Sequence, residues 1–162
     1  MARKQQEEAE FEAMTRPLEG IPLPDLENLP DYERGFWEGT RSHELRIQRC
    51  SDCKKYRHPP SPMCPHCHSM NYEWPGTNGQ GQVYSLVVVH HPVHRAIGEK
   101  EQVPYNICLI ELEEQEGLRI ISNVLDVPQD EISIGMPVEV TFMPTVDDPN
   151  VVLPMFVRAR SV

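Results

Sequence analysis

The chain has few aromatic side chains, no long apolar run and too few basic residues to balance its acidic ones. Only 7% of its 162 residues are aromatic. Its longest apolar run, Leu86 to Val89, is far too short to cross a bilayer. The first residues also lack the apolar stretch of a secretory signal. We therefore expect a cytoplasmic protein with no membrane partner.

The shortage of basic residues gives the chain a formal net charge of −10. Residues 1–44 carry −6 and residues 76–162 carry −7, whereas residues 45–75 between them carry +3. A protein that neutralises nucleic-acid phosphates needs a basic face, so we do not expect DNA or RNA as the main partner. A small phosphorylated ligand remains compatible with the basic middle segment.

Proline and glycine, in contrast, are abundant, with 16 and 9 residues. So much proline excludes a helical bundle and favours a mainly β fold. The last part of the chain predicts five strands, which match a five-stranded oligonucleotide/oligosaccharide-binding (OB) barrel, whereas a sandwich usually needs about seven. The predicted strands are 81–91, 105–112, 118–125, 138–143 and 153–159.

Four of the five cysteines form two C-x-x-C pairs that are ten residues apart: Cys50, Cys53, Cys64 and Cys67. Each pair can fold as a knuckle with two thiolates on one side, and two knuckles complete a tetrahedron around zinc. Because the shell is full, the zinc would be structural. Iron uses the same ligand set and remains an alternative, whereas a redox pair would need a βαβ context that the sequence lacks.

The remaining cysteine and the histidines predict no catalytic centre. Cys108 lies in the apolar run 106–110, where we expect a buried thiol without a nucleophile's accessibility. The histidines near the cysteine pairs are expected to be solvated, because the sulfurs already complete the shell: His58, His66 and His68. A second group has no local nucleophile or orienting residue: His90, His91 and His94.

Basic residues surround the cysteine pairs. A zinc ion with four thiolates carries a formal charge of −2, and nearby cations compensate it. The alternative, that some of these side chains contact the phosphates of a ligand shared with a partner, stays open. The candidates for that contact are Lys54, Lys55 and Arg57.

The N-terminal part predicts an arm followed by a short helix. Residues 1–14 are polar and helix-permissive, and residues 16–30 contain four prolines, which favour an extended path. Residues 31–42 predict a helix capped by Asp31, with Phe36 and Trp37 near one face. Residues 44–49 then alternate like a strand. We expect three parts: an arm and helix (1–43), a zinc ribbon (44–75) and an OB-fold domain (76–162).

These motifs together resemble a family of two-module proteins in which a rubredoxin-like zinc ribbon precedes an OB-fold and which are associated with acyl-CoA metabolism. The resemblance covers roughly residues 30–160. It depends on the order and spacing of Phe36-Trp37-Glu38-Gly39, Leu45, Ile47, Arg49-Cys50-x-x-Cys53, Pro59-Pro60, Cys64-Pro65-x-Cys67, Trp74, Gly79-x-Gly81-x-Val83-Tyr84-Ser85 and Gly135-Met136-Pro137-Val138-Glu139-Val140.

The resemblance implies a non-catalytic accessory subunit. Family members typically lack an active site, and they form complexes with thiolase-like enzymes or are fused or bound to hydratase-like ones. Phe36 and Trp37 would then pack on the partner or on the ribbon. Coenzyme A thioesters would be met only through the complex, with Lys54, Lys55 and Arg57 as candidate phosphate contacts. A sterol side chain and an aryl-succinyl-type intermediate of aromatic degradation are two possible substrates. The implied zinc ligands are Cys50, Cys53, Cys64 and Cys67.

One departure from the family and one alternative function remain. The family often has glycine directly after the second and fourth cysteines, where the turn favours positive φ, but this chain has Lys54 and His68. The alternative is a single-stranded nucleic-acid-binding module, because zinc ribbons and OB barrels both occur in such proteins. The acidic barrel segment weighs against that alternative.

Overall fold

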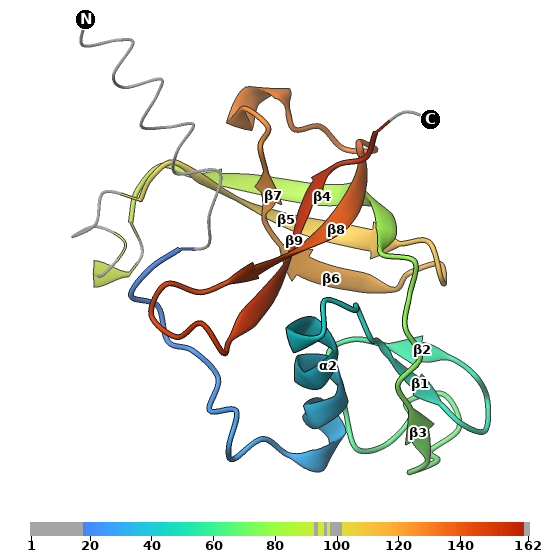
Figure 1. The fold of residues 1–162 in the computed structure, drawn as a ribbon. Coiled ribbons are helices and arrows are strands. Elements are labelled where there is room, and N and C mark those ends of the chain that lie inside the picture. Colours follow the sequence, from blue (N-terminus) through green and yellow to red (C-terminus); the bar gives the residue numbers. More distant parts are fainter. Residues whose placement is uncertain (1–17, 93, 96, 98–101, 161–162) are drawn as a thin grey trace, which may run out of the picture.

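The computed structural model describes residues 18–160 except 93, 96 and 98–101, and its fold is mainly β, as predicted (Figure 1). The polar segment 1–14 lies outside the described residues. Within them, a three-stranded sheet and a six-stranded sheet accompany an α-helix of 11 residues. No helix in this described part is long and apolar enough to cross a membrane.

The arm from residue 18 to residue 30 forms no helix or strand, as its prolines predict, and it turns at residues 26–28. Its first residues lie against loops of the C-terminal domain. The backbone N–H of Glu19 donates to the side chain of Gln102 at 2.7 Å, and that of Gly20 donates to Asp147 at 2.6 Å. The arm therefore runs along the barrel before it reaches the helix.

The helix α2 (Asp31–Arg41) occupies the predicted segment, but Asp31 does not cap it. Pro30 is the N-cap residue, and no side chain there accepts a hydrogen bond. Asp31 is instead the first helical residue, where its negative charge still favours the positive end of the helix dipole. Proline fits this boundary because its fixed φ suits the entry to a helix. The buried face of α2 consists of Gly35, Phe36, Gly39 and Thr40.

The ribbon is a small antiparallel sheet of very short strands in the order β2-β1-β3: β1 (Gln48–Cys50), β2 (Tyr56–Arg57) and β3 (Tyr72–Glu73). Of the predicted strand at 44–49, only the last two residues belong to a strand, β1. Arg46 forms one isolated bridge to Gly76. The alternation was nevertheless informative, because Leu45 and Ile47 are 2% and 0% exposed.

The C-terminal domain is a barrel-like OB fold whose sheet has the order β6-β5-β4-β8-β9-β7. Four of the predicted strands lie within two residues of their expected bounds. The helix-like turn η1 (Gln129–Glu131) precedes β8. The strands are β4 (Gln80–Val89), β5 (Tyr105–Leu112), β6 (Arg119–Ser122), β7 (Val124–Leu125), β8 (Pro137–Pro144) and β9 (Val152–Arg158).

The prediction of one continuous strand at 118–125 is wrong, because Asn123 divides this segment into β6 and β7. β6 pairs antiparallel with β5, whereas β7 pairs parallel with β9. The break has a local cause. The Asn123 carbonyl accepts from the Phe156 N–H at 3.0 Å, while its side-chain amide donates to the Asn106 carbonyl. The chain thus changes partners at Asn123, and this change brings the two edges of the sheet together.

One continuous core connects the helix, the ribbon and the barrel. Phe36 of α2 and Ile47 of the ribbon belong to the same buried cluster as Val83, Ile110 and Phe156 of the barrel. Figure 1 shows α2 next to the ribbon strands and below the barrel. The shared core holds the cysteine loops in a fixed position relative to the barrel.

Candidate functional site

The structure brings the four paired cysteines together. Cys50 ends β1, and the other three lie in the two turns that follow β1 and β2. All four sulfur atoms lie within 4.8 Å of one another. The Sγ atoms of Cys50 and Cys67 are 3.6 Å apart, as are those of Cys53 and Cys64. Four sulfurs at about 2.3 Å from a tetrahedral zinc would be about 3.8 Å apart, so the residues present fit that ion.

The pKa values of the thiols show the effect of this crowding. A backbone N–H of Cys53 lowers the pKa of Cys50 to about 6, against the opposing effect of burial. The Ser69 N–H favours the thiolate of Cys67, but burial and the three neighbouring sulfurs outweigh it and raise that pKa to about 12. Thiolates this close repel one another unless a cation lies among them. The cluster is therefore suited to a metal ion.

Two equivalent knuckle turns set the sulfurs in place. The N–H of Lys54 donates to the Cys50 carbonyl at 3.1 Å, and the N–H of His68 donates to the Cys64 carbonyl at 2.9 Å. Lys54 has φ of 61° and His68 has φ of 60°, so both adopt the left-handed conformation that glycine takes without strain. The non-glycine residues therefore preserve the knuckle geometry but strain the backbone.

Relief of that strain predicts a stabilising substitution. We expect Lys54→Gly to raise the free energy of unfolding by about 1 kcal/mol. A left-handed non-glycine residue costs about 1–2 kcal/mol, and the greater conformational entropy that glycine loses on folding offsets part of the gain from removing this strain. The lost ion pair of Lys54 with Glu73, 3.2 Å long and exposed, contributes little. Thermal unfolding of the zinc-loaded protein measures the effect. The neighbouring Lys55, which has no positive φ, is the control, and Lys55→Gly should not stabilise.

The basic residues beside the cysteines occupy different environments. Arg49 and Lys54 both pair with Glu73, at 2.8 Å and 3.2 Å. Lys55 is exposed, whereas Arg57 is only 7% exposed and donates to the Ser61 carbonyl at 3.1 Å. Of the three candidate phosphate contacts, Lys54 and Lys55 are therefore accessible, whereas the side chain of Arg57 is buried.

The expectation of solvated histidines is correct for His66 and His68, which are exposed, and wrong for His58. The His58 ring lies 5.2 Å from that of Phe36, and its Nδ1 is enclosed without a hydrogen-bond partner in the described part of the chain. Burial lowers the pKa of His58 to about 4. The contact comes from a helix 22 residues earlier in the chain, so no local pattern indicates it.

The burial of His58 predicts a loss of stability in mild acid. Its folded-state pKa, about 4, lies below the ordinary value of 6.5, so the unfolded chain binds the extra proton. The stabilisation is complete above pH 6.5 and declines as the pH falls toward 4. Between pH 7 and pH 5, wild type should lose roughly 2 kcal/mol more than His58→Phe, which cannot titrate. Urea unfolding at both pH values, with zinc present, measures the difference. His66→Gln should behave like wild type, and equal losses in wild type and His58→Phe would contradict the prediction.

The other two groups from the sequence lie outside this centre. Cys108 is fully buried, and its Sγ lies 3.4 Å from the side-chain oxygen of Asn106. Burial raises the pKa of Cys108 to about 11, and the expectation of a buried thiol is confirmed. His90 and His91 are exposed at the end of β4, and His94 is exposed in the loop that follows.

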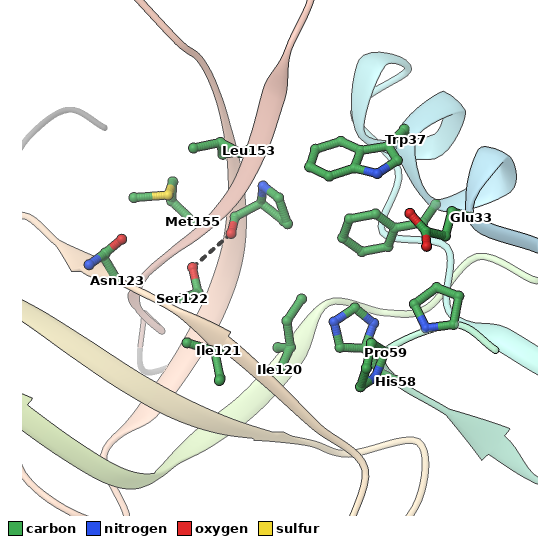
Figure 2. Close-up of a pocket in the computed structure, with 13 residues that line it drawn as sticks. Glu33, Trp37, His58, Pro59, Ile120, Ile121, Ser122, Asn123, Leu153 and Met155 are labelled. Carbon is green, nitrogen blue, oxygen red and sulfur yellow. Dashed lines mark hydrogen bonds between the residues drawn. The ribbon is translucent and has the colours of Figure 1, made fainter. Parts of the chain in front are cut away.

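A cleft that sequence reasoning missed lies beside the ribbon (Figure 2). It encloses about 380 Å³ between α2, the loop 58–60, β6 and β9. Phe36, at 7% exposed, is part of its wall, and the half-buried Trp37 faces it. No motif marks the cleft, because its walls come from four distant segments of the chain.

The sequence matches models of two domains from one family. Residues 37–73 match the domain described as "ChsH2, rubredoxin-like zinc ribbon domain", and residues 74–143 match "ChsH2, C-terminal OB-fold domain". Among solved structures, the "Ltp2-ChsH2(DUF35) aldolase" contains a chain that is 39% identical, with a TM-score of 0.71. The alignment covers 82% of this chain and 98% of that one.

Several curated proteins are also similar. A probable enoyl-CoA hydratase alpha subunit of Thermomonospora curvata is 42% identical over 125 residues, which cover 76% of this chain and 37% of that protein. The 3-oxo-4,17-pregnadiene-20-carboxyl-CoA hydratase alpha subunit of Mycobacterium tuberculosis is 37% identical over 123 residues, or 74% and 37% of the two chains. This chain thus spans little more than a third of both subunits. A DUF35 domain-containing scaffold protein of Methanocaldococcus jannaschii is 39% identical over 95 residues, 58% of this chain and 64% of that one. The chain belongs to the ChsH2 (DUF35) family of zinc ribbon and OB-fold proteins.

Proposed function

We propose that this chain is a non-catalytic accessory subunit of an enzyme complex that degrades acyl-CoA thioesters, with a thiolase-like enzyme as its partner. The observation that carries the proposal is the cluster of four cysteines, which would fill every position around a tetrahedral metal. A metal bound in this way has no open position for a substrate. It can brace the chain, and the reaction would take place on the partner.

The metal in this proposal is zinc, held by Cys50, Cys53, Cys64 and Cys67. Bound there, zinc stabilises the fold by linking the two knuckles. The ribbon depends on such a link because its three strands contain only three, two and two residues. In this role, the part 44–75 is a rigid connection between the helix of 1–43 and the barrel of 76–162.

The names of the relatives support a partner that acts on acyl-CoA. Two relatives are named as alpha subunits of CoA-thioester hydratases, and the similar solved structure is named as an aldolase with two components. The archaeal relative is named as a scaffold protein. A hydratase-like partner is the alternative to the thiolase-like one. Among the thioesters considered, a sterol side chain is favoured by the substrate in the name of the mycobacterial relative.

The exposed residues near the ribbon are candidates for contacts within the complex. Trp37 is partly exposed, whereas Phe36 is buried and its ring packs edge-on against the Trp37 ring. We assign Trp37 to the partner contact and Phe36 to the packing against the ribbon. Lys54 and Lys55 are the accessible candidates for coenzyme A phosphates, and Arg57 would have to turn outward to take part.

Co-purification tests the proposal. The chain is co-expressed with a thiolase-like or a hydratase-like subunit from the same organism, and each mixture is separated by size exclusion. We expect one stable hetero-oligomer with the thiolase-like subunit, whose acyl-CoA turnover should depend on the complex. Elution of the chain alone, with turnover unaffected by its presence, would refute the proposal. Complex formation only with the hydratase-like subunit would change the identity of the partner.

A further inference from the structure

The cleft beside α2 has the size and lining of a binding site. Its volume of about 380 Å³ falls in the range of sites that accept a small molecule or a large side chain. In Figure 2, Trp37 and His58 lie on one side of the opening, and Leu153 lies across from them. The lining is mostly apolar and includes Phe36, Trp37, Ile120, Ile121, Leu153 and Met155.

The few polar groups of the cleft indicate which chemistry it accepts. Ser122 is occupied, because its hydroxyl donates to the Pro154 carbonyl at 2.7 Å. His58 Nδ1 is enclosed and has no partner among the described residues. Glu33 is the one carboxylate of the lining, which contains no lysine or arginine. The cleft therefore complements an uncharged or positive group that donates hydrogen bonds, and it offers no countercharge to an anion.

The apolar surface continues beyond the cleft. Ile121, 71% exposed, lines the cleft and is also paired with Leu109 of β5. Val87, 56% exposed, is paired with Ile107, two residues along β5 from Leu109. Directly paired residues project to the same face of a sheet. We call these four residues the outer apolar patch. Its continuity with the cleft makes a surface larger than a small ligand covers, as at a protein interface.

We propose that the cleft receives a tyrosine or tryptophan side chain of the partner subunit, and that the outer apolar patch packs against the residues around this anchor. Such a side chain fills an apolar cleft and brings one O–H or N–H donor for Glu33 or His58. At neutral pH His58 is uncharged, because burial lowers its pKa to about 4, so it can accept a hydrogen bond. The proposal rests on the accessory-subunit function and identifies where the partner binds.

The chemistry of the cleft favours a protein side chain over the coenzyme A part of a thioester. Coenzyme A carries negatively charged phosphates, and the lining places a carboxylate where a cation would be needed. The walls also come from α2, the ribbon loop and the barrel together. An anchor seated there would contact all three parts at once, and buried aromatic anchors of this kind dominate many interfaces.

The first experiment needs no partner. Indole, p-cresol and hexanoate are titrated separately into the isotope-labelled, zinc-loaded full chain, and NMR shifts are followed. We expect saturable binding of indole and p-cresol, on the order of millimolar affinity for fragments of this size, with shifts at Trp37, His58 and Ile120. Hexanoate should bind at least fivefold more weakly. Absence of saturable aromatic binding, or a preference for hexanoate, would overturn the proposal.

Variants of the cleft provide the second experiment. Leu153→Trp fills the cleft from β9, and Ile121→Asp charges its exposed rim. Each should weaken binding to the co-eluting partner subunit at least tenfold and abolish the indole shifts. Ile134→Trp enlarges a side chain that is also 71% exposed but lies outside the cleft, and it should change neither. Thermal unfolding verifies that each variant is folded.

The two proposals fail in different ways. If wild type binds the thiolase-like subunit and the cleft variants bind it equally well, the cleft inference is wrong and the accessory function stands. If wild type binds no subunit, the accessory function is wrong, and with it the role of the cleft as a receptor for a partner. A complex that weakens only in Leu153→Trp and Ile121→Asp supports both.

Discussion

Replacing Cys64 with serine is expected to remove the metal and unfold the ribbon while the barrel stays folded. A structural zinc contributes apparent binding free energy of about 10 kcal/mol or more in small fingers. The ribbon has little to replace that energy, because its strands are very short and its buried residues Leu45 and Ile47 lie at its border with the barrel. Metal analysis should show a fall from about one zinc per chain to none. In NMR spectra, residues 48–73 should lose their dispersion, while the residues of β4 and β5 keep theirs.

The fifth cysteine supplies the matched control. Cys108→Ala also removes a buried thiol, but Cys108 lies in the barrel and outside the four-sulfur cluster. This variant should keep its zinc and lose only the free energy of unfolding expected for a small cavity, about 1 kcal/mol. The unfolded ribbon of Cys64→Ser should also release the partner subunit while the partner's own residues stay intact. A Cys64→Ser protein that retains one zinc and a dispersed ribbon would show that the metal does not hold this fold.

Sequence patterns identified those features of the molecule that depend on neighbouring residues. The C-x-x-C spacing places two sulfurs on one turn, so Cys50, Cys53, Cys64 and Cys67 could be grouped without a structure. Alternation of apolar and polar residues located the barrel strands, because successive side chains of a strand point to opposite faces. The helix at residues 31–41 was located by its polar start and its aromatic face.

The features that sequence analysis missed depend on contacts between distant segments. The segment 118–125 has strand-forming residues on both sides of Ser122 and Asn123, and the hydrogen bonds of Asn123 to Asn106 and Phe156 show that the chain changes strand partners there. His58 is partly buried by its contact with Phe36 of α2, and the cleft forms from α2, the ribbon and the barrel. Contacts between distant segments determine the change of strand partners, the environment of His58 and the shape of the cleft, so a local stretch of sequence does not predict these features.

The glycines of α2 show how tertiary contact overrides helix propensity. Glycine in a helix costs about 1 kcal/mol relative to alanine, so Gly35 and Gly39 weaken the helix in isolation. In the fold, a Cβ added at Gly39 would lie 2.7 Å from the Glu44 carbonyl oxygen. A Cβ added at Gly35 would overlap the ring atoms Cγ, Cδ1 and Cδ2 of Trp74. The two glycines therefore allow the chain after α2 to pack directly on the helix backbone.

Gly35→Ala should for this reason destabilise the protein although it improves helix propensity. The overlap involves the base of the Trp74 ring, which also packs edge-on against Tyr72 at 6.2 Å and cannot turn away as a flexible side chain would. Overpacking costs typically 1–3 kcal/mol, occasionally more, so we expect a net loss of about 3 kcal/mol. Thermal unfolding should show a midpoint lower by roughly 6–12 °C for a chain of this length.

A double-mutant cycle separates the overlap from other effects. Trp74→Leu removes the ring, so Gly35→Ala in that background should be neutral or stabilise by up to about 1 kcal/mol, the ordinary helix-propensity gain. The coupling between the two positions should then exceed about 2 kcal/mol. The exposed Glu38→Ala on the same helix is the matched control and should stay within about 0.5 kcal/mol of wild type. If Gly35→Ala stabilises in both backgrounds, the helix does not depend on its close approach to Trp74.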